Sequence, residues 1–329
     1  MKDKKTIFVF HGPFRDYCPK YAEYKKSQGF AFGKRMMQML KSMDSHFEKY
    51  IIETPCLTKE MVEEYAAKRG NESPITQNKR ITQIRQFAIF MNHMGFDFYV
   101  YPMKLIKMSN TFTPYIFTHY EIKKIYDVID HLEISPYIKN YNLIYPMMFR
   151  MLYGCGLRIN EALSLKREHV DLENGVLILT HAKNNTSRLV PMSESLTKYC
   201  ILYMKKMGRT ITQNGYYFPS RDGGRYSHTP VFLKLKKFMS EAGIRTDSGR
   251  IPRVHDIRHS FSVHTLDLMT ANGWDAYCSL PVLSTYLGHS DIKSTEKYLR
   301  LTEESFNTVT SALSLSHTGV FPEVCYEKK

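Results

Sequence analysis

A short β-hairpin pattern interrupts a chain whose apolar residues otherwise recur mostly at helical spacing. The segments VLILT (176–180) and RLVPM (188–192) are rich in β-branched and aliphatic residues, and the polar loop HAKNNTS (181–187) separates them. Helical patterns at about 140–153 and 159–166 precede the hairpin, and further helical patterns follow it. The chain is therefore expected to be mainly α with a small β-hairpin or sheet, which is an α+β fold.

The first third of the chain has the pattern of a small helical domain. Residues 23–48 mix apolar and basic positions at helical spacing, and Thr58 is suited to cap a helix over 58–69. A third helix is expected over 75–95, where Gly95 ends an apolar stripe. The stripe consists of Ile81, Ile84, Ala88 and Met91.

Three basic residues lie off the apolar stripe of this third helix. Lys79, Arg80 and Arg85 share its other faces with several glutamines. Such charges form an ordinary solvated face in many helices, and they also suit contact with the phosphates of DNA. The sequence leaves both readings open, so the three residues are candidates for DNA binding.

A linker is expected before a second, larger domain. The segment 103–117 lacks clean periodicity and carries Ser, Asn, Thr and Pro. Thr118 and Glu121 then form the T-x-x-E pattern of a helix start. The expected divisions are a helical N-terminal domain, a linker, a larger mixed domain and a C-terminal tail, at residues 1–108, 109–117, 118–314 and 315–329.

The charge of the chain favours a polyanionic partner. The formal net charge is +14 and the isoelectric point is near 9.3, so nucleic acid is the first candidate and a membrane surface the second. No stretch approaches the about 18 apolar residues that a membrane span needs, and the apolar run near the N-terminus is too short for a signal peptide. We therefore expect a soluble, cytoplasmic protein without a membrane partner.

No sequence pattern indicates a metal or a disulfide framework. The six cysteines are scattered and contain no C-x-x-C pair. His255 and His259 have the i,i+4 spacing of some metal ligands, but the glutamate of a zincin helix is missing, and Arg258 between them would repel a cation. We expect no metal and no cofactor.

Several short stretches of the second half contain residues that could carry chemistry. The candidates are Arg158 in GCGLRINEAL, Lys183 in the hairpin loop, His255 and Arg258 in VHDIRHSF, His289 in LGHS, and Tyr298 nine residues after that histidine. Each has a structural explanation when it is taken alone. Arg158 could pair on the surface, and Lys183 could be one more loop cation.

Taken together, these residue types suit attack on a phosphodiester. Charge in a phosphoryl transition state lies on the non-bridging oxygens, which forked arginine donors match well. Histidine adds a hydrogen-bond donor and a proton carrier, and lysine can protonate the leaving oxygen. A tyrosine hydroxyl, with a pKa of about 10, needs such a cationic surround to act as the nucleophile.

The second half resembles the catalytic domain of the tyrosine recombinase (phage integrase) family. GLRINEAL is similar to the first arginine motif of the family, HDIRH to its H-x-x-R-H motif, and LGHSDIKSTEKY to its L-G-H motif with the nucleophilic tyrosine. Lys183, five residues before Arg188, matches the lysine of the family's β-hairpin. All six positions are filled in family order, across roughly 118–310.

The resemblance implies a role for each residue. Tyr298 would form a 3′-phosphotyrosyl link, and His255 would assist proton transfer while Lys183 protonates the leaving 5′ oxygen. The residues that would hold the scissile phosphate are Arg158, Arg258 and His289. Glu161 and His259 are similar to supporting residues of the same motifs. The N-terminal domain would be the family's helical core-binding domain.

The resemblance also implies partners. These are double-stranded DNA with a specific recombination site, a homo-tetramer on synapsed DNA, and accessory directionality proteins, with the enzyme among the DNA of the nucleoid. The segment between His255 and His289 is about eight residues longer than in simpler members, which favours a mobile-element integrase. The alternatives are a Xer-like dimer resolvase, a type IB topoisomerase and a DNA-binding protein that lacks catalysis.

Overall fold

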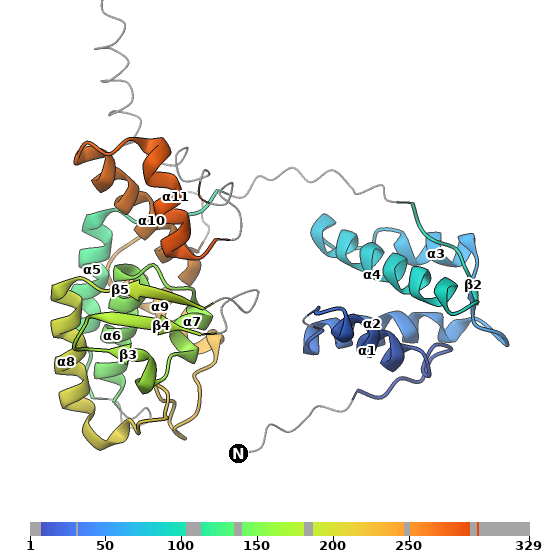
Figure 1. The fold of residues 1–329 in the computed structure, drawn as a ribbon, viewed down its shortest axis with the longest axis horizontal. Coiled ribbons are helices and arrows are strands. Elements are labelled where there is room, and N and C mark those ends of the chain that lie inside the picture. The colour runs from blue at the N-terminus through green and yellow to red at the C-terminus, as the bar shows by residue number, and fades with distance from the viewer. Residues whose placement is uncertain are drawn as a thin grey trace, which may run out of the picture. The chain divides into compact units, whose positions relative to one another are not determined.

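The computed structural model describes residues 8–30, 32–102, 113–134, 140–180, 187–246, 251–289 and Thr295. The chain divides into two compact units, residues 1–111 and 112–329. The boundary falls inside the stretch expected to be a linker. Figure 1 shows the helices and strands of each unit. Each unit has its own hydrophobic core. The expected mainly α architecture with small sheets is confirmed.

The N-terminal unit is a helical domain with one short parallel strand pair. Its elements are α1 (Cys18–Ser27), α2 (Lys34–His46), a 3-10 turn (Phe47–Lys49), β1 (Cys56–Leu57), α3 (Lys59–Ala66), α4 (Pro74–His93) and β2 (Asp97–Phe98). The Thr58 side chain caps α3 as expected, and Ser73 caps α4, where Pro74 occupies the first helical turn. The single helical stretch expected over 23–48 is instead divided between α1 and α2, because Gly29 turns the chain at a φ of +82°.

The core of this unit is rich in aromatic rings, and it includes Phe10 and Phe14, which precede α1. Phe14 packs within 5.4 to 5.7 Å of the rings of Phe47, Phe87 and Phe98. The buried carboxylate of Asp44 accepts hydrogen bonds of 2.8 Å from the backbone N–H groups of Gly12 and Phe14. These bonds fix the segment before α1, for which the sequence suggested no role.

The C-terminal unit combines helices with a three-stranded antiparallel sheet. Its helices are α5 (His119–Asp130), α6 (Tyr141–Gly154), α7 (Ile159–Ser164), α8 (Glu194–Met207), α9 (His228–Glu241), α10 (Val254–Ala271) and α11 (Ala276–Leu287), with 3-10 turns at Arg167–His169 and Gly208–Thr210. The strands are β3 (Val170–Asp171), β4 (Val176–Leu179) and β5 (Arg188–Pro191), in the order β3-β4-β5. The predicted hairpin is confirmed as β4 and β5, and Leu179 pairs with Arg188 where the two strands meet the loop.

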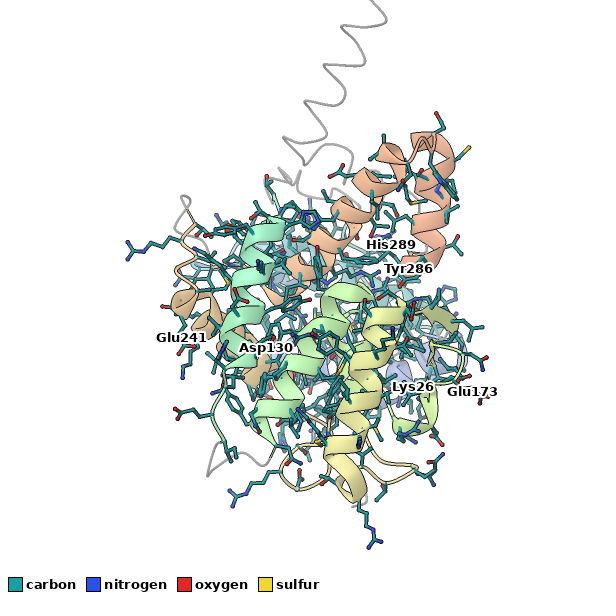
Figure 2. The ribbon with its side chains drawn as sticks, turned by 90° about the vertical axis from the view of Figure 1, so that its left-hand side faces the viewer. Lys26, Asp130, Glu173, Glu241, Tyr286 and His289 are labelled. Atoms are coloured by element: carbon teal, nitrogen blue, oxygen red, sulfur yellow. The ribbon has the colours of Figure 1, made fainter. Side chains whose placement is uncertain are left out.

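Local signals in the sequence account for how this unit begins. Thr118 and Glu121 form the predicted capping box of α5, with the Thr118 N–H donating to Glu121 Oε2 at 2.8 Å. Just before it, the Phe117 N–H donates to the Ser260 hydroxyl of α10 at 2.8 Å. Figure 2 shows Tyr286 and His289 close together where α11 ends, between the orange helices and the rest of the C-terminal unit. Among the described residues, no helix is long and apolar enough to cross a membrane.

Candidate active site

The carboxylate of Glu161 binds two arginines from distant parts of the sequence. It lies in the first turn of α7, where it accepts hydrogen bonds of 2.8 Å from both the backbone N–H and Nη1 of Arg158. Arg188, at the start of β5, binds the same carboxylate with Nη1 and Nη2 at 2.8 and 2.9 Å. The Arg258 guanidinium lies 3.8 Å from it. Glu161 thereby gathers three arginines around one buried negative charge.

Glu161 remains ionised because of these arginines. Burial by itself would raise its pKa, but the hydrogen bonds and positive charges of Arg188 and Arg158 lower the pKa to about 2. The carboxylate is therefore negatively charged at neutral pH and can bind the arginines. It offsets part of the repulsion that would otherwise separate the clustered guanidinium groups.

Backbone carbonyls complete the positioning of Arg158 and Arg258. Arg158 Nη2 donates to the carbonyl of Gly288 at 2.8 Å. The fully buried Arg258 donates to the carbonyls of Gly156 and Leu287, both at 2.6 Å. The GCGLR turn before α7, the N-terminal half of α10 and the LGH turn after α11 are thus joined through two arginine side chains.

Two histidines stand beside the arginines. His289 follows Gly288, and its Nδ1 lies 2.8 Å from the hydroxyl of Thr295. Burial, together with Arg258 and Arg158, lowers the pKa of His289 to about 4. For His255, crowding by the surrounding protein, then His259 and Arg258, lowers the pKa to about 4, although this residue keeps an exposed side. Both imidazoles are therefore neutral at pH 7, able to donate one hydrogen bond and accept another.

A cleft of about 860 Å³ opens at this site. Arg158, Glu161 and His255 line it on one side, and Ile178 and Thr180 of the hairpin line another part of it. Lys166 and His169 also reach its wall. The cleft combines cationic and neutral donors, which is the chemistry that binds a phosphate.

The structure brings most of the predicted site residues together. Arg158, Glu161 and Arg258 are linked by the contacts given above, and His289 directly follows Gly288, whose carbonyl Arg158 binds. The ring of His255 is 4.7 Å from that of His259. Lys183 and Tyr298 lie outside the described residues. Within the described part of the chain, no group of three or more His, Cys, Asp or Glu residues is placed to share a metal ion.

Arg188 belongs to this site, although the sequence did not indicate it. Its sequence position only locates Lys183 in the hairpin. A signal was present, because an arginine begins the otherwise apolar strand RLVPM, and its side chain, 12% exposed in the structure, needs a partner for its charge. Its partner, Glu161, is 27 residues away along the chain.

The candidate DNA-binding residues of α4 have different surroundings. Lys79 is exposed and lines a cavity of about 540 Å³ with Lys25 and Arg35. Arg85 is half-buried. The expectation that Arg80 lies away from the core is wrong: its side chain is 7% exposed and pairs with Glu72 at 2.5 Å. The guanidinium also donates to the carbonyl of Ala67 at 2.9 Å, so Arg80 joins α4 to the segment before it.

The fold and the site define a class of protein that comparison with known proteins identifies. The profile of the phage integrase family matches residues 116–305, and the chain belongs to this family. An integrase/recombinase named y4rE from Sinorhizobium fredii is 28% identical over 289 residues, which are 85% of this chain and 89% of the relative. The tyrosine recombinase XerD of Pseudomonas putida is 35% identical over 155 residues, which are 46% and 47% of the two chains.

Solved structures share the same fold. The Tn1549 transposon integrase, in complex with a circular intermediate DNA, matches with a TM-score of 0.62 at 16% identity, covering 90% of this chain and 98% of the other. The XerH site-specific recombinase, in its post-cleavage complex with the difH substrate, matches with a TM-score of 0.60 at 18% identity, covering 87% and 81%. With the family established, the protein is a tyrosine-type site-specific recombinase.

Proposed function

We propose that this chain is a DNA integrase that cuts and rejoins strands through a 3′-phosphotyrosyl intermediate and moves a mobile element. The observation that carries the proposal is the gathering of Arg158 and Arg258 around Glu161, with His289 directly after the Gly288 carbonyl that Arg158 binds, beside a cleft lined by Arg158, Glu161 and His255. Arg158, Arg258 and His289 come from separate motifs, and their donors suit a bound anion as a common partner. The scissile phosphate of DNA is that anion.

The chemical step assigns each residue one task. The hydroxyl oxygen of Tyr298 attacks the phosphorus and forms a new P–O bond, while the bond from phosphorus to the 5′ oxygen breaks. The tyrosine proton passes to His255, and Lys183 gives a proton to the departing 5′ oxygen. A second strand's 5′ hydroxyl then reverses the step and restores a phosphodiester. The bond energy stays in the tyrosyl ester, so no nucleotide cofactor is consumed.

The electrostatics of the site suit this step. Arg158 is held by Glu161 and the Gly288 carbonyl, while 22% of its side chain remains exposed on the side of the cleft. A rigid guanidinium stabilises transition-state charge without a cost of reorganisation. The low pKa of His255 leaves its imidazole neutral, which is the form that can accept the proton of Tyr298.

The partners of the reaction follow from the class of enzyme. The substrate is double-stranded DNA with a specific recombination site, and strand exchange between two sites requires four subunits, so we propose a homo-tetramer on synapsed DNA. The Tn1549 integrase and XerH were both solved with DNA, and these proteins share the fold of this chain. Accessory proteins would set direction. The place of action is the DNA of the cytoplasmic nucleoid.

A second candidate is a Xer-like resolvase of chromosome or plasmid dimers. It is favoured by the identity of 35% to XerD of Pseudomonas putida, which extends over about half of each chain. The mobile-element function is favoured by the long segment between His255 and His289, and by the fuller match to the Sinorhizobium fredii integrase/recombinase. The position of the recombination site in the genome distinguishes the two functions. An integrase site lies at the ends of a mobile element, whereas a resolvase site is not flanked by such an element.

The chemical proposal is tested through the nucleophile. The purified protein first selects its binding sequence from a library of random duplexes, and that sequence is then built into a duplex with a nick that traps the covalent intermediate. The wild type should form a detergent-resistant protein–DNA adduct, and mass spectrometry should place the phosphate on Tyr298. Tyr298→Phe should bind the duplex with unchanged affinity and form no adduct. An adduct in this variant would contradict the assignment of the nucleophile.

A further inference from the structure

Arg188 joins three segments of the C-terminal unit that lie far apart in the sequence. It begins β5, it binds both carboxylate oxygens of Glu161, and its Nε donates to the carbonyl of Tyr286 at 3.0 Å. We propose that Arg188 is a positioning residue for strand cleavage, which fixes Arg158 and the Gly288–His289 turn in the geometry that receives the scissile phosphate. The inference rests on the proposed function and adds a residue to it.

The first path from Arg188 to the phosphate site runs through Glu161. The two parallel hydrogen bonds, 2.8 and 2.9 Å long, prevent the carboxylate from rotating. Oε1 of the same carboxylate accepts Arg158 Nη1 at 2.8 Å, so Arg158 is aligned by an acceptor whose direction Arg188 sets. Without Arg188, the carboxylate could turn and carry the Arg158 guanidinium with it.

The second path runs through the turn after α11. Gly288 has a φ of +65°, and a Cβ atom there would lie 2.9 Å from Nη1 and 3.0 Å from Cδ of Arg188. The arginine therefore rests directly against this backbone, while Arg158 binds the Gly288 carbonyl. His289 is the next residue. Arg188 thus supports the turn that positions two groups: the Gly288 carbonyl, which Arg158 binds, and the imidazole of His289, which is proposed to bind the phosphate.

The nitrogens of Arg188 are engaged within the protein, at the edge of the site and not in the lining of its cleft. Each of its three nitrogens already donates within the protein, and its side chain is only 12% exposed. It is absent from the lining of the cleft, whereas Arg158 and His255 are part of that lining. Its effect on the reaction must therefore pass through the residues that it holds.

A matched control lies in the same unit. Arg150 also forms a two-bond pair with a carboxylate, that of Asp130, at 2.8 and 2.5 Å; the Arg150 side chain is 10% exposed and that of Asp130 is 42% exposed. Arg150 packs between the rings of Tyr126 and Tyr199, and its hydrogen bonds among the described residues go to Asp130 and the Pro146 carbonyl. Arg150→Met and Arg188→Met therefore remove similar ion pairs, and only the second removes a support of the phosphate site.

The experiment measures single-turnover cleavage of the nicked duplex defined above. One form carries a normal scissile phosphate and the other a methylphosphonate, whose lower charge needs less help from arginine. Arg188→Met should bind DNA within a few-fold of wild type and cleave the normal phosphate about 10- to 100-fold more slowly, since a small misplacement has effects of that size. The loss should shrink on the methylphosphonate. Arg188→Lys should stay slow, because an ammonium group cannot form the two-bond fork.

The alternatives give different results. Arg150→Met should lower the melting temperature while its folded fraction cleaves both substrates at the wild-type rate. If Arg188→Met behaves in the same way, or loses equal rate on both substrates, Arg188 is only structural and the inference is overturned. If the Met variant does not fold, the same comparison for Arg188→Lys decides. Failure of the wild type to form an adduct would instead count against the proposed function.

Discussion

The guanidinium of Arg258 donates to the carbonyl of Gly156 at 2.6 Å, although the two residues are 102 positions apart. Gly156 can present this carbonyl because its φ is +57°, a conformation that residues with a Cβ atom adopt at a cost. A Cβ atom would also lie 2.3 Å from Cδ1 of Phe261. The position of an arginine that we propose to bind the scissile phosphate therefore depends on a glycine in a different motif.

Gly156→Ala is expected to damage both the fold and the site. Backbone strain and the clash with Phe261 should destabilise the protein by on the order of 2–4 kcal/mol. The shifted carbonyl should also slow DNA cleavage by the folded fraction. Gly243→Ala is the control, since Gly243 has a φ of +68° and open space where a Cβ atom would lie, and it should cost only about 1 kcal/mol. Urea denaturation and adduct formation measure the two effects, and equal stability losses in both variants would contradict the clash.

Acid should destabilise the protein through His264. Its Nδ1 lies 2.6 Å from the Tyr153 hydroxyl and its ring stacks on His119 at 3.9 Å. Burial and then His119 lower the pKa of His264 from 6.5 to about 4. Because the folded pKa is the lower one, the unfolded chain takes up the proton first as the pH falls from 6.5 towards 4. Stability is therefore full above pH 6.5 and declines through that window.

The variant His264→Gln separates this contribution from those of other groups. Glutamine can keep a hydrogen bond to Tyr153 and does not titrate. The fall in unfolding free energy between about pH 7 and about pH 5 should be smaller in the variant than in the wild type by about 1 kcal/mol. His255 and His289 shift in the same direction and should leave a residual slope in both proteins. Identical pH profiles would show that His264 is not the group responsible.

Lys183→Ala should affect the departure of the 5′ oxygen and no other step. We expect cleavage of a normal phosphodiester to slow by about 10²- to 10⁴-fold, the usual range for loss of a general acid. A substrate with sulfur at the 5′ bridging position has a leaving group that needs no proton, so its cleavage should be nearly unchanged. Lys166→Ala is a useful comparison, because Lys166 lines the same cleft without an assigned proton transfer. Equal losses on the two substrates would rule out the general-acid role.

Local signals in the sequence were sufficient for most of the elements, whereas the site residues were predicted from several motifs taken together. The β-branched and aliphatic residues of 176–180 and 188–192, with the polar loop between them, predicted β4 and β5, and the T-x-x-E pattern at Thr118 predicted the start of α5. Such features depend on a few neighbouring residues, so spacing alone reveals them. The spacing within GLRINEAL also placed Arg158 and Glu161 together, since residues three apart share a helical turn.

Contacts between distant segments could not be predicted in this way. The pairing of Arg188 with Glu161 and with the carbonyl of Tyr286 requires the hairpin, α7 and the end of α11 to meet. The burial of Arg80 has the same origin. A basic residue on a predicted helix was expected to face solvent, but Glu72, eight residues earlier, supplies a carboxylate that makes burial possible.

Lys79 and Arg80 are adjacent in α4 and should respond to substitution in opposite ways. Lys79 is exposed beside Lys25 and Arg35, so Lys79→Ala should weaken DNA binding and reduce the slope of log K against log salt by about 1. Its stability should not change. Arg80→Ala removes one partner of a buried ion pair and should destabilise the protein by about 3–5 kcal/mol.

Two measurements on the same variants distinguish the roles. Filter binding of the selected duplex across a salt series reports the phosphate contacts, and urea denaturation reports stability. For Arg80→Ala, binding by the folded fraction should keep the wild-type salt slope, because its guanidinium is occupied by Glu72 and the Ala67 carbonyl. A reduced slope in this variant would mean that Arg80 leaves its ion pair to contact DNA. An unchanged slope for Lys79→Ala would instead place the DNA on another face of the N-terminal unit.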